Sequence, residues 1–253
     1  ASELSITCSF SIEHAHTNNL ELPLAPAAEI YPFAYSLADR FDLAPYLRPH
    51  YDDPDGELTS WSRQFLNDTG PTHTRQVLLQ MNRTIREHFR YASRDEEGTQ
   101  TPLETLEAGS GSCRDFALLM MEAARHLGIA TRFVSGYLYD PALDPDDDDD
   151  EVTDIAARAR SWVASDAPVI APGDAPIPTV GAGATHAWMQ AYLPGAGWVP
   201  FDPTNNLLGG TQLIRVAVAR DPGQAAPVSG SWFGEADAYC GMNVQVQVRR
   251  VKP

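Results

Sequence analysis

The sequence has few residues of several kinds, and each shortage excludes a class of protein. Only three of its 253 residues are cysteine (Cys8, Cys113 and Cys240), too few and too widely spaced for a disulfide framework or a zinc site with short paired spacings. No run of 18 apolar residues is present and no signal peptide opens the chain, so we expect neither a membrane span nor a secretory leader. These features favour a reducing compartment, and we expect a cytoplasmic protein.

Positive charge is also scarce. The chain has one lysine, Lys252, beside 17 arginines, and its formal net charge at pH 7 is −16. Because most of this surface would repel a polyanion, we expect no nucleic-acid partner. The acidic run from Asp146 to Glu151 lacks the alternating ligands and central glycine of an EF-hand loop, and consecutive carboxylates usually mark a solvated loop. We therefore expect no bound metal and no cofactor.

One of the three cysteines stands where a helix is predicted to begin. Cys113 follows the glycine-rich residues 109–112 and opens an amphipathic segment that Gly128 is expected to end. Unpaired amides and the positive end of the helix dipole favour thiolate over thiol at such a position. A buried structural thiol is an equally good interpretation of the position alone. Apolar residues recur at helical spacing along the segment: Phe116, Leu119, Met120, Ala123 and Leu127.

A catalytic cysteine needs a histidine base that a third group orients. His186 opens THAWMQAYLPGAGWVPFDPTNN (185–206), which predicts a strand, a turn at Pro194–Gly197 and a second strand that runs into Asp202. Pairing in this hairpin would make His186 and Asp202 cross-strand neighbours, so that the carboxylate orients the ring. Taken alone, each residue has an ordinary interpretation: His186 as a surface residue at a strand end, and Asp202 as a turn former before Pro203. The other six histidines are less well placed: His14, His16, His50, His73, His88 and His126.

The residues around this triad occur in blocks that resemble a known family. GSGSCRDFA (109–117), LGIATRFVSGYLY (127–139) and THAWMQAYLPGAGWVPFDPTN (185–205) follow one another in the order found in the transglutaminase-like superfamily, in its bacterial cysteine-protease branch. The resemblance covers about residues 74 to 206, and the flanks 43–51 and 216–234 are also similar.

The resemblance implies the role of each residue in the triad. Cys113 corresponds to the nucleophile, His186 to the general base and acid, and Asp202 to the group that holds the histidine. It also implies an α+β fold with a papain-like core, in which the nucleophile helix packs on an antiparallel sheet. We expect the backbone N–H of Cys113 to contribute to an oxyanion hole. Tyr91 and Trp188 are candidates for a second donor, although packing is the favoured interpretation of both.

Such a site implies a thioester intermediate with a protein or peptide amide as substrate. Resolution by water makes the protein a peptidase or amidase, and resolution by an amine makes it a protein-glutamine transglutaminase; deamidation is a further outcome. A binding protein that keeps the fold without activity is the alternative class. The oligomeric state stays open.

The chain divides into three predicted regions. Residues 1–65 are expected to be β-rich, 66–208 to form the catalytic core, and 209–253 to form a β-rich C-terminal segment; 43% hydrophobic residues suffice for a sizeable core. Alternating apolar residues predict terminal strands at 4–14 and 242–251, with Cys8 and Cys240 as buried small residues. Within the core, one helical face carries Val77, Leu78, Met81, Ile85 and Phe89.

Two segments depart from the family pattern. Residues 140–184 are an insertion, rich in Asp, Pro, Gly and Ala, which we interpret either as a flap over the substrate cleft or as a solvated acidic loop. The C-terminal run ARDPGQAAP (219–227) replaces the GRD and DVAP-like pattern more usual in the branch.

Overall fold

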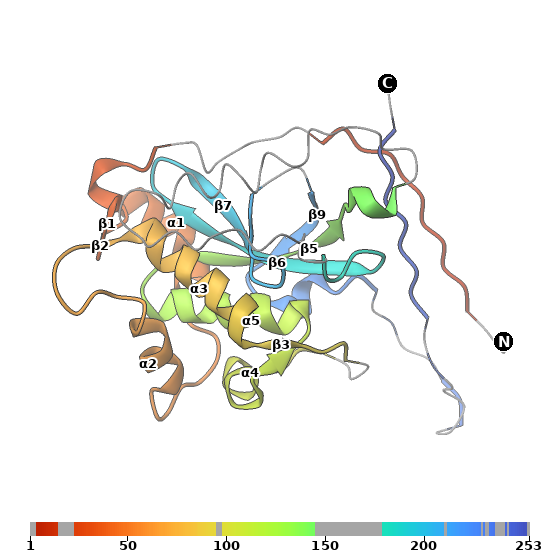
Figure 1. Cartoon of the computed structure of the whole chain (residues 1–253), viewed down its shortest axis with the longest axis horizontal. Coiled ribbons are helices and arrows are strands. Elements are labelled where there is room, and N and C mark those ends of the chain that lie inside the picture. Colours follow the sequence, from red (N-terminus) through yellow and green to blue (C-terminus); the bar gives the residue numbers. More distant parts are fainter. Residues whose placement is uncertain are drawn as a thin grey trace.

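A five-stranded antiparallel sheet with the strand order β8-β7-β6-β5-β9 forms the centre of the molecule in a computed structural model (Figure 1). The strands are β5 (Thr131–Leu138), β6 (Thr185–Leu193), β7 (Gly197–Asp202), β8 (Leu207–Leu208) and β9 (Leu213–Ala219). The structure describes residues 4–14, 23–94, 98–144, 179–209, 212–228, 230, 233–235, 241 and 243–251.

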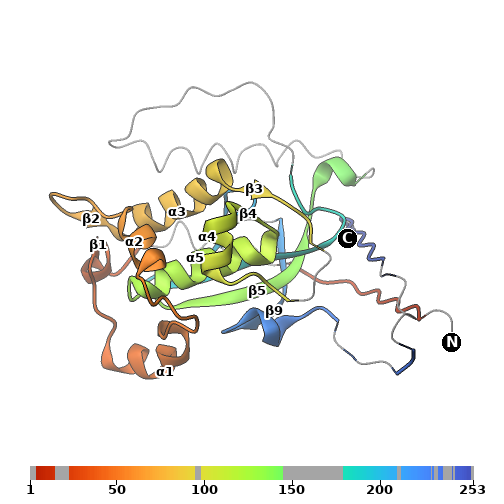
Figure 2. The same ribbon diagram turned by 90° about the horizontal axis from the view of Figure 1, so that it is seen from below.

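Helices cover the sheet, and most of them lie on one side of it. Figure 2 shows α3, α4 and α5 together on one side of β5 and β9, with α1 towards the other side. The helices are α1 (Leu37–Leu47), α2 (Glu57–Arg63), α3 (Thr74–His88), α4 (Pro102–Ala108) and α5 (Cys113–His126). Short elements complete the described fold: β1 (Ile30–Tyr31), β2 (Thr72–His73), β3 (Arg90–Tyr91), β4 (Ser110–Gly111), and the 3₁₀ turns Pro26–Ala28, Pro141–Leu143 and Pro222–Ala225. The α+β fold predicted from the sequence is confirmed.

Helix α5 is the centre of the core. The sequence predicted one inward face, but 12 of its 14 residues are buried, because the sheet covers one side while α2, α3 and α4 cover the others. Gly128 follows the helix with a φ of +75°, a left-handed conformation that suits glycine and ends α5 as predicted. The predicted inner face of α3 is likewise confirmed, since Val77, Leu78, Met81 and Ile85 are fully buried.

The prediction of a β-rich region over residues 1–65 was wrong for its described part. Residues 37–47 and 57–63 are helical, and 4–14 form no strand. The Ser36 side chain caps α1 by accepting a hydrogen bond from the amide of Asp39 at 3.1 Å, and the sequence analysis missed this local helix signal. Cys8 is exposed, so its predicted burial was also wrong.

The C-terminal region follows its prediction only in part. Strand β9 pairs with β5 and so belongs to the central sheet. Residues 243–251 form no strand, although their sequence alternates; Val246 donates one backbone hydrogen bond to the Gly183 carbonyl at 3.1 Å. Alternation of apolar and polar residues indicates only that a strand here would have one apolar and one polar face. A β-strand also needs a neighbouring strand to hydrogen-bond with. Cys240 lies outside the described residues.

A buried ion pair holds α5 to its surroundings. Arg125 donates to Glu122 at 2.5 Å, and neither side chain is exposed. Glu122 also accepts from the amides of His50 and Tyr51. The remaining guanidinium donors reach backbone carbonyls on three other segments, those of Tyr46, Thr131 and Arg220. The pair therefore joins α5 to the segment before α2, to β5 and to the chain after β9.

Replacing Arg125 with methionine is expected to lower the free energy of unfolding by about 3–5 kcal/mol, because Glu122 then stays buried without its partner. The exposed pair Arg83–Glu87, at 2.7 Å on α3, supplies the matched control. Arg83→Met should cost no more than about 1 kcal/mol, as exposed pairs do. Urea denaturation of the two variants measures both values, and equal losses would contradict this role for the buried pair.

Candidate active site

The turn before α5 is organised by one buried carboxylate, that of Asp115. Its Oδ2 accepts from both the amide and the hydroxyl of Ser112, each at 2.8 Å. Its Oδ1 accepts from the Gln100 amide at 2.7 Å and from the Arg94 guanidinium at 3.0 Å. An acidic side chain in the first turn that bonds back to the N-cap amide fixes where a helix begins. Asp115 therefore fixes the position of Cys113, the first residue of α5.

Gly111 allows this carboxylate to lie so close to the chain. A Cβ at position 111 would stand 2.8 Å from the Cβ of Asp115, which is closer than two such atoms approach. The glycine-rich stretch before Cys113 thus has a packing role beside the turn that the sequence indicated. Asp115 itself was missed in the sequence, although the spacing Ser112-x-x-Asp115 is that of a capping box.

The hairpin β6–β7 brings His186 and Asp202 together. His186 Nε2 and Asp202 Oδ2 are 2.8 Å apart, and both side chains are fully buried. The register pairs Met189 with Phe201, so that Trp188, not His186, lies opposite Asp202. The two residues meet as diagonal neighbours, a separation that a histidine ring can bridge.

Two further groups hold the Asp202 carboxylate. Oδ1 accepts from the Thr204 amide at 2.9 Å, and Oδ2 accepts from Asn205 Nδ2 at 2.9 Å. Burial alone would raise the pKa of Asp202, but the His186 ring and these donors lower it below its ordinary value. Asp202 is therefore ionised at neutral pH.

Cys113 is the other partner of the His186 ring. Burial lowers the pKa of His186, but Asp202 and the Cys113 side chain, with which the ring interacts, raise it to about 10. Nε2 is engaged by Asp202, and Nδ1 is buried with no hydrogen bond to any residue that the structure describes. The structure thus brings the three predicted residues together, with the His186 ring between the Asp202 carboxylate and the Cys113 side chain.

The two aromatic candidates differ in their positions. Trp188 is buried and stacks on His186 with ring centroids 6.0 Å apart, in agreement with a packing role. Tyr91 is half-buried beside the start of α5, where its ring meets Phe116 edge-on at 6.4 Å. Burial together with Cys113 and Asp115 raises the pKa of Tyr91 to about 12, so its hydroxyl keeps its proton at neutral pH.

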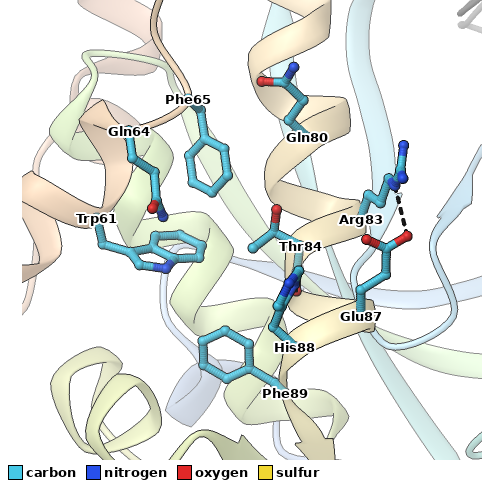
Figure 3. A pocket seen from close by; sticks show the side chains of 9 residues that line it. All are labelled: Trp61, Gln64, Phe65, Gln80, Arg83, Thr84, Glu87, His88 and Phe89. Carbon is cyan, nitrogen blue, oxygen red and sulfur yellow. Dashed lines mark hydrogen bonds and ion pairs between the residues drawn. The ribbon is translucent and has the colours of Figure 1, made fainter. Parts of the chain in front are cut away.

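A separate pocket of about 580 Å³ opens between α2 and α3 (Figure 3). None of the triad residues lines it, and we assign it no role. Its lining comprises Trp61, Gln64, Phe65, Gln80, Arg83, Thr84, Glu87, His88 and Phe89.

The described residues hold no group of three His, Cys, Asp or Glu side chains arranged for a metal ion, and no described helix has the length and apolarity to cross a bilayer. The acidic run 146–151 and most of the insertion, residues 145–178, lie outside the described residues.

The chain is similar to known sequences over most of its length. Residues 60–203, more than half of the chain, match the family model of the transglutaminase-like superfamily. An uncharacterised protein of Mycobacterium leprae is 26% identical over 250 residues, which cover 98% of this chain and 74% of that protein. An uncharacterised protein of Mycobacterium tuberculosis is 29% identical over 159 residues, 61% of this chain and 41% of its own length. The chain thus spans less than half of that second relative.

A solved structure shows a similar fold. A chain from Cytophaga hutchinsonii, named a "putative cysteine protease", aligns with a TM-score of 0.50 and 21% identity, and the alignment covers 83% of this chain and 55% of that one. At this identity the likeness concerns the fold alone.

Removing the Asp115 carboxylate is expected to destabilise the turn that presents Cys113. Asp115→Ala leaves the Ser112 and Gln100 amides and Arg94 without their acceptor, and the free energy of unfolding should fall by about 3 kcal/mol or more. Glu104→Ala is the matched control, since Glu104 closes the capping box of α4 at an exposed position and should cost about 1 kcal/mol or less. Thermal and urea denaturation measure both, and equal losses would contradict a special role for Asp115.

Proposed function

Since the chain belongs to the transglutaminase-like superfamily, we propose that it is a cysteine-dependent amide hydrolase, a peptidase or amidase that acts through a thioester on Cys113. One observation carries the proposal. The buried His186–Asp202 pair, 2.8 Å apart, interacts with the cysteine at the start of α5. A nucleophile, a base and a group that orients the base are the parts that covalent catalysis requires.

The resting site is an ion pair in this mechanism. His186 is an imidazolium at neutral pH because its pKa is raised to about 10. In the mechanism that we propose, the Cys113 sulfur reacts as a thiolate beside this ring. The thiolate sulfur attacks the carbonyl carbon of the amide, a C–S bond forms, and the carbonyl electrons move to the oxygen. When the tetrahedral intermediate collapses, the C–N bond breaks and the imidazolium gives its proton to the leaving amine.

Water then resolves the thioester. The neutral His186 ring takes a proton from water as the water oxygen attacks the acyl carbon, and the C–S bond breaks to release the acid and restore the thiolate. The Asp202 carboxylate keeps the same ring edge engaged in both halves of the reaction. Its lowered pKa means that it orients the ring as an anion and does not accept the proton.

The oxyanion of the intermediate needs donors. The amide of Cys113 has no acceptor within its own helix because Cys113 is the first residue of α5. Tyr91 is our candidate for the second donor, since its hydroxyl remains protonated and it lies beside Cys113. Trp188 is a packing residue in this scheme.

Alkylation of Cys113 tests the nucleophile against a control in the same chain. Cys8 is exposed and Cys113 is buried, so access alone favours Cys8. At pH 6 iodoacetamide should nevertheless modify Cys113 faster, because in the proposed mechanism the His186 ring activates the Cys113 sulfur. His186→Ala should slow Cys113 by about tenfold or more without changing Cys8. Peptide mapping by mass spectrometry reads both sites; equal rates in the wild type and the variant would disprove the proposal.

Incubation with a glutamine-containing peptide, with and without a primary amine, tests whether water or an amine accepts the acyl group from the thioester. Hydrolysis predicts cleavage or deamidation whose yield does not depend on the amine. A product in which the amine is attached would identify a transglutaminase instead. Cys113→Ala is the control, and it should abolish every product. No product with any peptide or amide, together with an unreactive Cys113, would indicate a binding protein that keeps the fold.

The His186–Asp202 pair also predicts how stability depends on pH. A folded-state pKa raised from 6.5 to about 10 stabilises the fold fully below pH 6.5, and this contribution disappears as the pH rises to about 10. The difference in free energy of unfolding between the wild type and His186→Gln should therefore shrink over this range. Urea denaturation at several pH values measures it. A difference that stays constant or grows with pH would contradict the imidazolium–carboxylate pair.

A further inference from the structure

Asn205 makes three hydrogen bonds with its side-chain amide, two of which are to one segment. Its Oδ1 accepts from the Val180 amide at 2.8 Å, and its Nδ2 donates to the Val180 carbonyl at 3.0 Å. The other Nδ2 hydrogen goes to Asp202 Oδ2 at 2.9 Å. Both amide hydrogens and the oxygen are thus used. Turning the amide over would set its oxygen against a carboxylate and a carbonyl, so its orientation is fixed.

The oxygen that Asn205 contacts is the one that holds the histidine. Asp202 Oδ2 accepts from Asn205 and from His186 Nε2, while Oδ1 is left to the Thr204 amide. With two donors on one oxygen and one on the other, the plane of the carboxylate is determined. A carboxylate with a fixed plane can align an imidazole ring, whereas a rotating one cannot.

The segment held by Asn205 also reaches the other edge of the same ring. Gly181 follows Val180 with a φ of +90°, and a Cβ built on it would stand 3.0 Å from His186 Nδ1. The backbone at 181 therefore lies beside Nδ1, the nitrogen that Asp202 does not engage. Asn205 thus acts on the ring from two sides, through Asp202 at Nε2 and through Val180–Gly181 at Nδ1.

We propose that Asn205 is a positioning residue for the catalytic histidine, which fixes the ring by joining Asp202 to the Val180–Gly181 backbone. The inference rests on the proposed function, since it assigns Asn205 a role in aligning His186 with Cys113. Asn205 touches neither substrate nor reacting atoms in this role. Its removal should loosen the ring and thereby weaken the pairing of imidazolium with thiolate.

The test is the pH profile of Cys113 alkylation by iodoacetamide, followed by peptide mapping. In the wild type the reaction should persist to low pH because the thiolate is paired. In Asn205→Ala the acid limb should move up by about one pH unit, equivalent to a tenfold lower rate on that limb. Asn206→Gly is the matched control, since Asn206 bonds to Asn82 and already has a φ of +54° that glycine accepts. Its profile should equal that of the wild type.

A second pair of variants tests the Nδ1 side independently of Asn205. Gly181→Ala and Gly183→Ala both place a side chain at positive φ, +90° and +82°, so they impose similar backbone strain. Only at 181 does the new Cβ meet the ring; at 183 nothing lies within 4 Å. Gly181→Ala should move the acid limb as Asn205→Ala does, and Gly183→Ala should not.

The outcomes separate this inference from the function on which it rests. If His186→Ala leaves the acid limb unchanged, the proposed function fails. If His186→Ala moves it but Asn205→Ala and Gly181→Ala do not, the function stands and the positioning role is overturned. Should Asn205→Ala fail to fold, Asn205→Ser keeps a neutral polar group at this position, but its single hydroxyl hydrogen cannot serve both Asp202 and the Val180 carbonyl. A wild-type profile in that variant would likewise overturn the role.

Discussion

The burial of α5 on all sides is the constraint on which the rest of the structure depends. In a helix with one solvent-exposed face, polar side chains can hydrogen-bond to water. In α5, which a sheet and three helices enclose, they cannot. Each charged group that faces inward must therefore find a partner within the protein. Asp115 does so at the start of α5, and Glu122 and Arg125 do so in its second half. These contacts fix the helix both along its axis and about it.

This constraint explains why the helix start is suited to a nucleophile. The sulfur of Cys113 is placed by a helix that cannot slide or turn, whereas His186 and Asp202 are placed by the separate framework of the β6–β7 hairpin. The two frameworks pack against each other, because α5 lies on β5 and β6, and the site forms where the start of the helix faces the hairpin. A change of about one ångström in either would separate the Cys113 sulfur from the His186 ring, so the proposed chemistry needs both supports to be rigid. The Asp115 contacts support the first framework, and those of Thr204 and Asn205 support the second.

The parts of the site that could be predicted are those that depend on neighbouring residues in the sequence. The helix at Cys113 and the hairpin from His186 to Asp202 follow from periodicity, glycine placement and a tight turn, each read within about twenty residues. The diagonal register was not predicted, because it depends on the turn and on the twist of the strands. The partners of Asp115 and Arg125 lie up to 95 residues away, and no local pattern encodes such distances. The alternation of apolar and polar residues at 4–14 was misleading for the same reason. A strand forms only when a second strand pairs with it, and the sequence of one segment does not show whether such a partner exists.

The contacts of Asn205 also hold the chain just before β6, the strand that carries His186. Val180 is held at both its amide and its carbonyl, six residues before His186, by a side chain whose third bond is to the Asp202 carboxylate. The chain that enters β6 is therefore anchored, before the strand begins, to the same carboxylate that bonds to the His186 ring.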